Sequence, residues 1–109
     1  MDDLTIKEMQ KMQKQLWEIH KNEWSPMSAT YGKNFILWMI SEVGEVIDII
    51  KKKGDDEVMK SESVREKFIE ELCDVLMYFN DILLRYEITP DEFVAGYRYK
   101  HEKNMTRKY

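Results

Sequence analysis

The chain has 109 residues, of which 35% are charged, and its formal net charge is −4. This length predicts a single domain over residues 1–109, and the acidic balance argues against nonspecific binding to DNA or RNA, which requires a basic surface. No apolar run is long and uncharged enough to span a bilayer, and the acidic N-terminus lacks the features of a signal peptide. We therefore expect a cytoplasmic protein whose partners include neither a membrane nor a nucleic-acid polymer.

Glycine and proline are scarce, with four and two residues, and Leu, Ile, Met, Glu and Lys recur, so we expect an all-α protein. The first predicted helix covers about residues 4–22, where apolar residues recur at helical spacing among charged ones. The segment around Pro26 ends it, because the residue before a proline avoids the helical region. Cys73 is the only cysteine, which excludes an internal disulfide and predicts a reduced, buried thiol.

The second predicted helix begins within residues 30–34 and ends at Lys53. It closes with a run of three lysines, whose charge complements the negative end of the helix dipole, and Gly54 then offers a C-cap. The polar residues 55–63 that follow predict a loop.

Two further helices are predicted after this loop. The third covers about residues 64–86, with Ser61 or Ser63 as its N-cap. The fourth starts at Thr89, an N-cap residue followed by a proline and two acids, and it ends near Arg107.

The second and third predicted helices are apolar around most of their circumference, within residues 35–50 and 68–84. A helix that is apolar nearly all round is normally buried, and a monomer of this size is too small to bury two of them. We therefore expect a four-helix bundle completed by homo-oligomerisation, as a dimer or a tetramer.

Two acidic pairs lie in these apolar segments, which contain no lysine or arginine. Glu42 and Glu45 form one pair, and Glu71 and Asp74 form the other. Residues at i and i+3 project from the same side of a helix, so antiparallel packing would bring all four carboxylates together. Because ionised carboxylates away from water need a cation, and because all these ligands are oxygens, we predict a Mg²⁺ site in which Mn²⁺ can substitute.

Two other interpretations of the acidic residues stay open. The acids can form solvated helix faces or pair with lysines of the first and fourth helices, which we expect for Asp48, Glu70 and Asp81. A redox-active, carboxylate-bridged metal centre is disfavoured, because ferritin-like di-iron sites use Glu-x-x-His elements and this sequence has none. His20 and His101 lie outside the acidic pairs and are expected at the surface.

The segments around the two acidic pairs, residues 41–46 and 70–76, resemble the core helices of the MazG-like family. This family belongs to the all-α nucleoside triphosphate pyrophosphohydrolases, which are related to dimeric dUTPases and dCTP pyrophosphatases. Its pattern of Glu-x-x-Glu on one helix and Glu-x-x-Asp on the next is matched here, and the resemblance covers most of the chain. Ser41 stands where family members commonly carry an additional acid.

The resemblance implies a hydrolase that cleaves nucleoside triphosphates between the α and β phosphates, releasing a monophosphate and pyrophosphate. Mg²⁺ would bridge phosphate oxygens and lower the pKa of a bound water. All four carboxylates would be metal ligands, and either Glu42 or Glu45 would orient or deprotonate the water. The implied cellular role is removal of surplus or damaged nucleotides.

A basic element near the C-terminus provides candidate phosphate ligands. Lys100, Asn104 and Arg107 lie at i, i+4 and i+7, on one face of a predicted helix. They resemble the Lys-x-x-x-Asn-x-x-Arg element of several MazG-like proteins, which contacts the triphosphate. The alternative is a solvated helix terminus whose positive charge complements the dipole.

Aromatic residues beside the acidic pairs are the candidates for holding the base. Trp38 lies one turn before the first pair, and Tyr78 one turn after the second, so both can flank the metal groove. Trp24 and Phe35 are weaker candidates, and Asn34 or Asn80 can read a base edge. The alternative for every aromatic is a place in the core.

A different class of function also stays open. The chain can be a noncatalytic helical oligomerisation or regulatory module that senses nucleotide or metal, an interpretation supported by the missing acid at Ser41. Turnover of nucleoside triphosphates would distinguish the enzyme from this module.

Overall fold

The computed structural model describes the whole chain, residues 1–109, and consists of five α-helices and one short 3-10 turn, with no strands. The elements are α1 (Ile6–His20), η1 (Ala29–Tyr31), α2 (Gly32–Lys53), α3 (Asp55–Lys60), α4 (Glu62–Arg85) and α5 (Pro90–Thr106). The predicted all-α class is therefore confirmed. The expected number of four helices is wrong, because a fifth helix lies between the second and third predicted ones.

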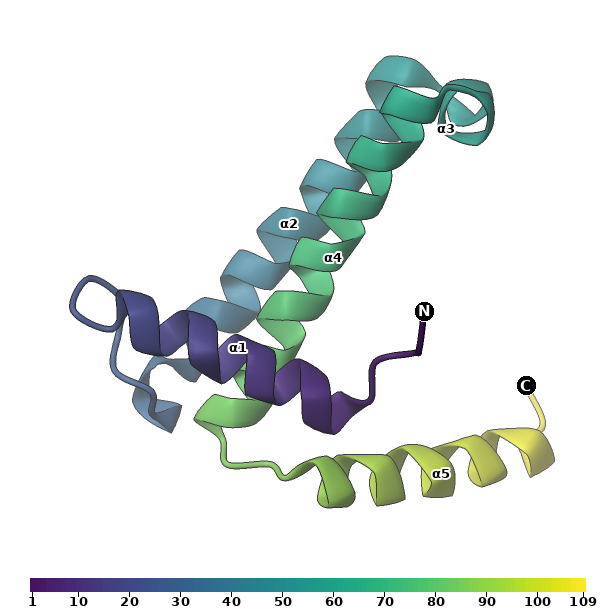
Figure 1. Cartoon of the computed structure of the whole chain (residues 1–109). Coiled ribbons are helices and arrows are strands. Elements are labelled where there is room, and N and C mark those ends of the chain that lie inside the picture. The colour runs from purple at the N-terminus through teal and green to yellow at the C-terminus, as the bar shows by residue number, and fades with distance from the viewer.

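The two long helices α2 and α4 lie side by side and antiparallel, as Figure 1 shows, and they form the most extensive contact in the molecule. Helix α1 crosses this hairpin near the start of α2 and packs against α4. Helix α5 extends away from the hairpin and contacts α1. The fold is thus a bundle-like helical hairpin with one crossing helix and one projecting helix. None of the helices combines the length and the apolarity needed to cross a membrane.

The polar segment expected as a loop forms α3 instead. Gly54, at a φ of 83°, ends α2 and starts α3 directly. Three acids occupy the first turn of α3, where they interact favourably with the helix dipole. Val58 is buried and anchors the short helix to the hairpin. Contact with α4 therefore stabilises a helix that composition alone does not predict.

Several of the helix caps predicted from the sequence are present in the structure. Gly54 donates its N–H to the Ile50 carbonyl at 2.8 Å, and the Thr89 hydroxyl accepts from the Glu92 N–H at 3.1 Å. Of the two candidate serines for the third predicted helix, Ser61 is the N-cap of α4. A Thr-x-x-Glu capping box at the start of α1, which was not among the predicted caps, also forms.

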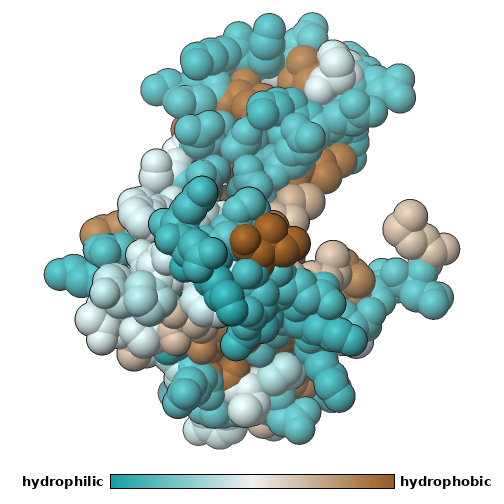
Figure 2. All heavy atoms as spheres, turned by 60° about the vertical axis from the view of Figure 1, so that its left-hand side comes forward, coloured by the Kyte–Doolittle hydropathy of each residue, from teal (hydrophilic) through white to brown (hydrophobic).

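Few apolar side chains are buried within one chain. Only Phe35, Val58 and Leu83 are buried, whereas many large apolar residues of α2 and α4 are exposed. Figure 2 shows hydrophobic side chains scattered among hydrophilic ones on one face of the molecule. The predicted buried thiol is wrong for the same reason, since Cys73 is exposed on a face of α4 that no other part of the chain covers completely.

Candidate metal centre and adjoining pocket

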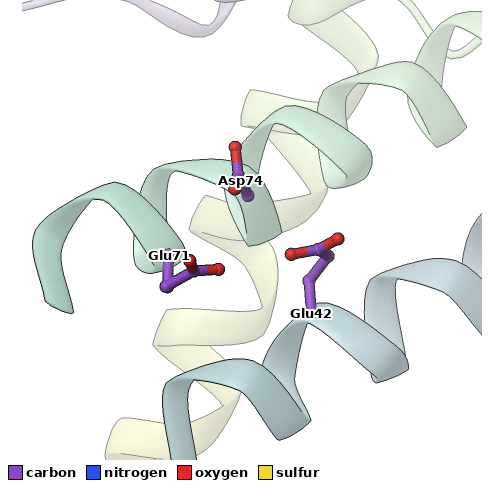
Figure 3. Close-up of side chains that lie close together, drawn as sticks. All are labelled: Glu42, Glu71 and Asp74. Atoms are coloured by element: carbon purple, nitrogen blue, oxygen red, sulfur yellow. The ribbon is translucent and has the colours of Figure 1, made fainter. Parts of the chain in front are cut away.

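Three of the four predicted metal ligands converge in the groove between α2 and α4. Glu42 comes from α2, and Glu71 and Asp74 come from α4. One carboxylate oxygen from each lies within 4.8 Å of the others. Figure 3 shows Glu42 and Glu71 extending into the gap between the two helices, with Asp74 close by on the same helix as Glu71. Glu71 is buried, and the other two are half-buried.

The electrostatics of this acidic group favour a cation. Burial raises the pKa of Glu42 above its ordinary value of 4.5, and repulsion from Asp74, Glu45 and Glu71 raises it further. A carboxylate is harder to ionise when other negative charges surround it and no positive charge compensates. Three carboxylate oxygens at this spacing could hold a metal ion.

One lysine lies closer to the acidic group than the sequence pattern predicts. Lys67 is one residue before the cation-free segment, and its Nζ lies 3.0 Å from Oε1 of Glu71, one turn later on α4. The hydrogen bond to Glu71 raises the pKa of Lys67. The expectation that no local cation neutralises these acids is therefore wrong for Glu71. A metal ion must compete with this exposed ammonium group.

Glu45, the fourth predicted ligand, is not part of the group of three. It is exposed on α2, one turn after Glu42, and its charge still contributes to the raised pKa of Glu42. The structure therefore places Glu45 beside the acidic group, as the most solvent-accessible of the four carboxylates.

A cavity of about 420 Å³ adjoins the acidic group, and Asp74 lines it. The candidate base-binding residues Trp38 and Tyr78 both line this cavity, together with Phe35. The Phe35 ring lies 4.8 Å from the Trp38 ring and 6.1 Å from the Tyr78 ring, measured between centroids. Trp38 and Tyr78 therefore lie at one cavity beside the carboxylates, and their role in holding a base stays a prediction.

Tyr78 connects the acidic group with the cavity. Burial raises the pKa of its hydroxyl, and the negative charges of Glu42, Asp74 and Asp81 raise it further. The phenol therefore stays neutral at physiological pH and keeps a hydrogen to donate.

Asp81 is the clearest departure from expectation. It is 1% exposed, and it pairs with Arg85 on its own helix instead of forming a solvated face or pairing with a lysine. Arg85 also donates from Nη1 to the Pro26 carbonyl at 2.6 Å, and its guanidinium lies 3.5 Å from the centroid of the Phe35 ring. Sequence reasoning missed Arg85, although an Asp-x-x-x-Arg spacing at the end of an apolar run was a usable signal.

The loop between α1 and η1 forms another wall of the cavity. Trp24 lines it and stacks on His20 at 4.6 Å, so that His20 is half-buried and not a simple surface residue. Trp17 donates its indole N–H to the Ser25 carbonyl at 2.9 Å. Together with the hydrogen bond from Arg85 to Pro26, this contact fixes the loop over the cavity.

The candidate base-edge asparagines lie outside the cavity. Asn34 is exposed near the start of α2. Asn80 is buried and donates to the Leu76 carbonyl at 3.0 Å.

The predicted phosphate ligands lie apart from the acidic group within one chain. Lys100 and Asn104 are on α5, and Arg107 follows its last residue, with its guanidinium 5.0 Å from the Tyr109 ring centroid. No residue of α5 lines the cavity that contains Asp74. Figure 1 shows α5 projecting away from the hairpin.

No family model matches the chain, and neither the curated proteins nor the solved structures contain a match. The functional interpretation therefore rests on the acidic group, the cavity beside it and their shared residue Asp74.

Proposed function

We propose that this protein is a Mg²⁺-dependent nucleoside triphosphate pyrophosphohydrolase of the MazG-like type. It cleaves the bond between the α and β phosphates, releases a monophosphate and pyrophosphate, and serves to remove unwanted nucleotides. One observation carries this proposal: Asp74 belongs to the acidic group and also lines the aromatic cavity, so the two sites adjoin. A metal-bound triphosphate and a stacked base need two such sites in contact.

Each part of the substrate has a proposed place. Glu42, Glu71 and Asp74 hold Mg²⁺, or Mn²⁺ in its place, and Trp38 and Tyr78 flank the base. When bound, the metal supplies charge neutralisation at the phosphates and activation of a water. Tyr78 keeps its proton, so it can donate a hydrogen bond to a phosphate or sugar oxygen.

Glu45 has a different proposed role from the other three carboxylates. It is the exposed acid and lies outside the group of three. We therefore assign to Glu45 the orientation or deprotonation of the attacking water, and to Glu42 the stronger contact with the metal. Both remain essential for turnover under this proposal.

The cationic residues are proposed to come from a second copy of the chain. Lys100, Asn104 and Arg107 lie on or just after the projecting helix α5, away from the cavity of their own chain. A triphosphate needs positive charge around it besides the metal. In a homo-oligomer, α5 of one subunit would supply that charge to the site of its neighbour.

An apolar stripe on α2 supports homo-oligomerisation. Leu37, Ile40 and Ile47 are 53%, 60% and 51% exposed, and a Cβ on Gly44 would meet nothing within 4 Å apart from the adjoining backbone of its own helix. At ~100° per residue these four residues share one face, about opposite to Glu42. The stripe can therefore meet another helix without closing the metal groove, and the glycine permits close approach.

Changing this stripe should dissociate the assembly. We expect Ile40→Asp to convert a dimer or tetramer into a smaller species, because a buried carboxylate without a partner is costly at an apolar interface. Light scattering coupled to size-exclusion chromatography measures the mass. Met59→Asp is the matched control, since Met59 is also largely exposed but lies on α3. Equal masses for wild type and Ile40→Asp would contradict the proposed interface.

A second candidate function has one observation in its favour. The Lys67–Glu71 ion pair neutralises one predicted ligand without any metal, which suits a noncatalytic oligomerisation or regulatory module that binds nucleotide. This module would bind nucleoside triphosphates without turnover.

The deciding experiment is an activity panel. The purified protein is incubated with Mg²⁺ and with ribo- and deoxyribonucleoside triphosphates, and monophosphate and pyrophosphate are quantified separately. We expect equal amounts of both products, and no product after addition of EDTA. Saturable nucleotide binding without turnover across the panel would instead establish the regulatory module.

A further inference from the structure

The cavity contains a buried carboxylate with one unused oxygen. Asp81 lines the cavity and is 1% exposed. Its Oδ1 accepts the hydrogen bond from Nε of Arg85, whereas Oδ2 is buried and has no hydrogen-bond partner. A buried acceptor without a donor is costly, and native proteins rarely leave one unexplained. Oδ2 therefore offers a place for a donor that a ligand brings.

Arg85 holds Asp81 in place but does not bind both oxygens of the Asp81 carboxylate. One nitrogen binds Oδ1 of Asp81, another binds the Pro26 carbonyl, and the flat face covers the ring of Phe35. These three contacts come from α4, the loop and α2, so the guanidinium is fixed and the carboxylate is fixed with it. The third nitrogen, Nη2, is buried and, like Oδ2 of Asp81, has no hydrogen-bond partner. The arrangement keeps a charged acceptor rigid at the wall of the cavity.

Gln13 is the other buried polar residue at this wall. It lines the same cavity from α1 and is 9% exposed. Burial raises the pKa of Asp81, and the Gln13 amide, after Arg85, opposes that rise. Oδ2 of Asp81 still has no hydrogen-bond partner. An amide can donate to a ring nitrogen that lies next to the group bound by Asp81.

We infer that Asp81 selects the base by accepting a hydrogen bond from an exocyclic amino group, which makes amino-bearing bases the preferred substrates. This inference rests on the proposed function, in which the aromatic cavity holds the base. Cytosine and adenine carry an amino group next to an unprotonated ring nitrogen, which matches Asp81 and Gln13. Uracil and hypoxanthine carry a carbonyl at the equivalent position, so they would set an oxygen against the carboxylate.

Two substrate pairs isolate the amino group. Among the pyrimidines, CTP carries the amino group and UTP carries a carbonyl in its place. Among the purines, ATP and ITP differ in the same way. We expect kcat/KM to favour the amino-bearing member of each pair by about 10- to 100-fold, the range for a hydrogen bond to a charged group. Ratios near one in both pairs, in a protein that does hydrolyse triphosphates, would overturn the inference and leave the proposed function standing.

Asp81→Asn tests the residue itself. Asparagine keeps the shape but adds an N–H that can meet a carbonyl, so the preference for CTP over UTP should fall to near one or reverse. A residue with a purely structural role would change stability and total activity but not this ratio. Asp56→Asn, an exposed acid on α3, is the control and should keep the wild-type ratio.

A binding measurement on the wild-type protein separates this inference from the proposed chemistry. Cytidine and uridine carry no phosphate and need no metal, so their dissociation constants from NMR titration report on the cavity alone. Tighter binding of cytidine would support the role of Asp81 even if no triphosphate is hydrolysed or Asp81→Asn fails to fold. Equal binding of both nucleosides, or binding of neither, would overturn it.

Discussion

Replacing Glu42 with glutamine should lower Mg²⁺-dependent turnover by about a thousandfold and should raise the melting temperature of the metal-free protein. The loss of turnover follows because stabilisation of charge by a metal ion contributes several kcal/mol to catalysis. The gain in stability follows because burial, and then repulsion from Asp74, Glu45 and Glu71, raises the pKa of Glu42. Removing its charge relieves that repulsion when no metal is present.

The stabilisation of the metal-free protein by Glu42→Gln should depend on pH. Because the pKa of Glu42 is raised above 4.5 by folding, the folded state binds its proton more tightly than the unfolded state. In the wild-type protein, this tighter proton binding by Glu42 stabilises the folded state fully below the pKa of the unfolded state. The contribution is lost as the pH rises through the pKa of the folded state. The difference in melting temperature between Glu42→Gln and wild type, measured in EDTA, should therefore be larger at pH 7 than at pH 4.

Addition of Mg²⁺ should reverse the order of the melting temperatures, so that wild type melts above Glu42→Gln. A cation that binds only the folded state stabilises it, and it needs an ionised carboxylate to do so. Wild type should gain melting temperature at pH 7 with Mg²⁺, and Glu42→Gln should gain little. Glu66→Gln, an exposed acid on α4, serves as the control. Equal stabilisation of all three proteins by Mg²⁺ would contradict a metal site at Glu42.

The convergence of Glu42, Glu71 and Asp74 could be predicted because it depends on local geometry, although the same spacing did not bring Glu45 into the group. A spacing of i and i+3 places Glu71 and Asp74 on one side of α4, and a tight antiparallel connection brings them to Glu42 on α2. The unexpected helix α3 left this outcome unchanged, since it replaces a loop without altering the direction of either long helix. The position of Trp38 and Tyr78 at the cavity beside the acids followed for the same reason, because each lies one turn from an acid.

Features that depend on distant contacts could not be predicted. Asp81 follows Asp74 by seven residues, so helical periodicity puts both on one face of the helix, but it gives no sign that Asp81 is buried. Its burial depends on Arg85, which reaches the Pro26 carbonyl of a loop 59 positions away in the sequence. Cys73 shows a related limit, since an apolar run indicates that a helix has an apolar face but not whether the same chain covers it.

Replacing Arg85 with methionine should destabilise the protein by about 3–5 kcal/mol at pH 7. The substitution leaves the Asp81 carboxylate buried without its ion-pair partner, which is among the costliest changes a small domain can undergo. Urea denaturation measures the loss, and Arg98→Met on α5, an exposed position, is the matched control. A loss of less than about 1 kcal/mol would show that water reaches Asp81 and that the pair is not truly buried.

The pH and a double substitution identify the cause of this destabilisation. Burial already raises the pKa of Asp81, and Arg85 opposes that rise. Without Arg85 the pKa should rise further, so the variant should regain stability as the pH falls and the carboxyl group becomes neutral. Adding Asp81→Leu to Arg85→Met should also restore most of the stability at pH 7, because two apolar side chains of similar volume can replace a buried ion pair. A double variant as unstable as the single one would instead assign the loss to the contacts of Arg85 with Phe35 and Pro26.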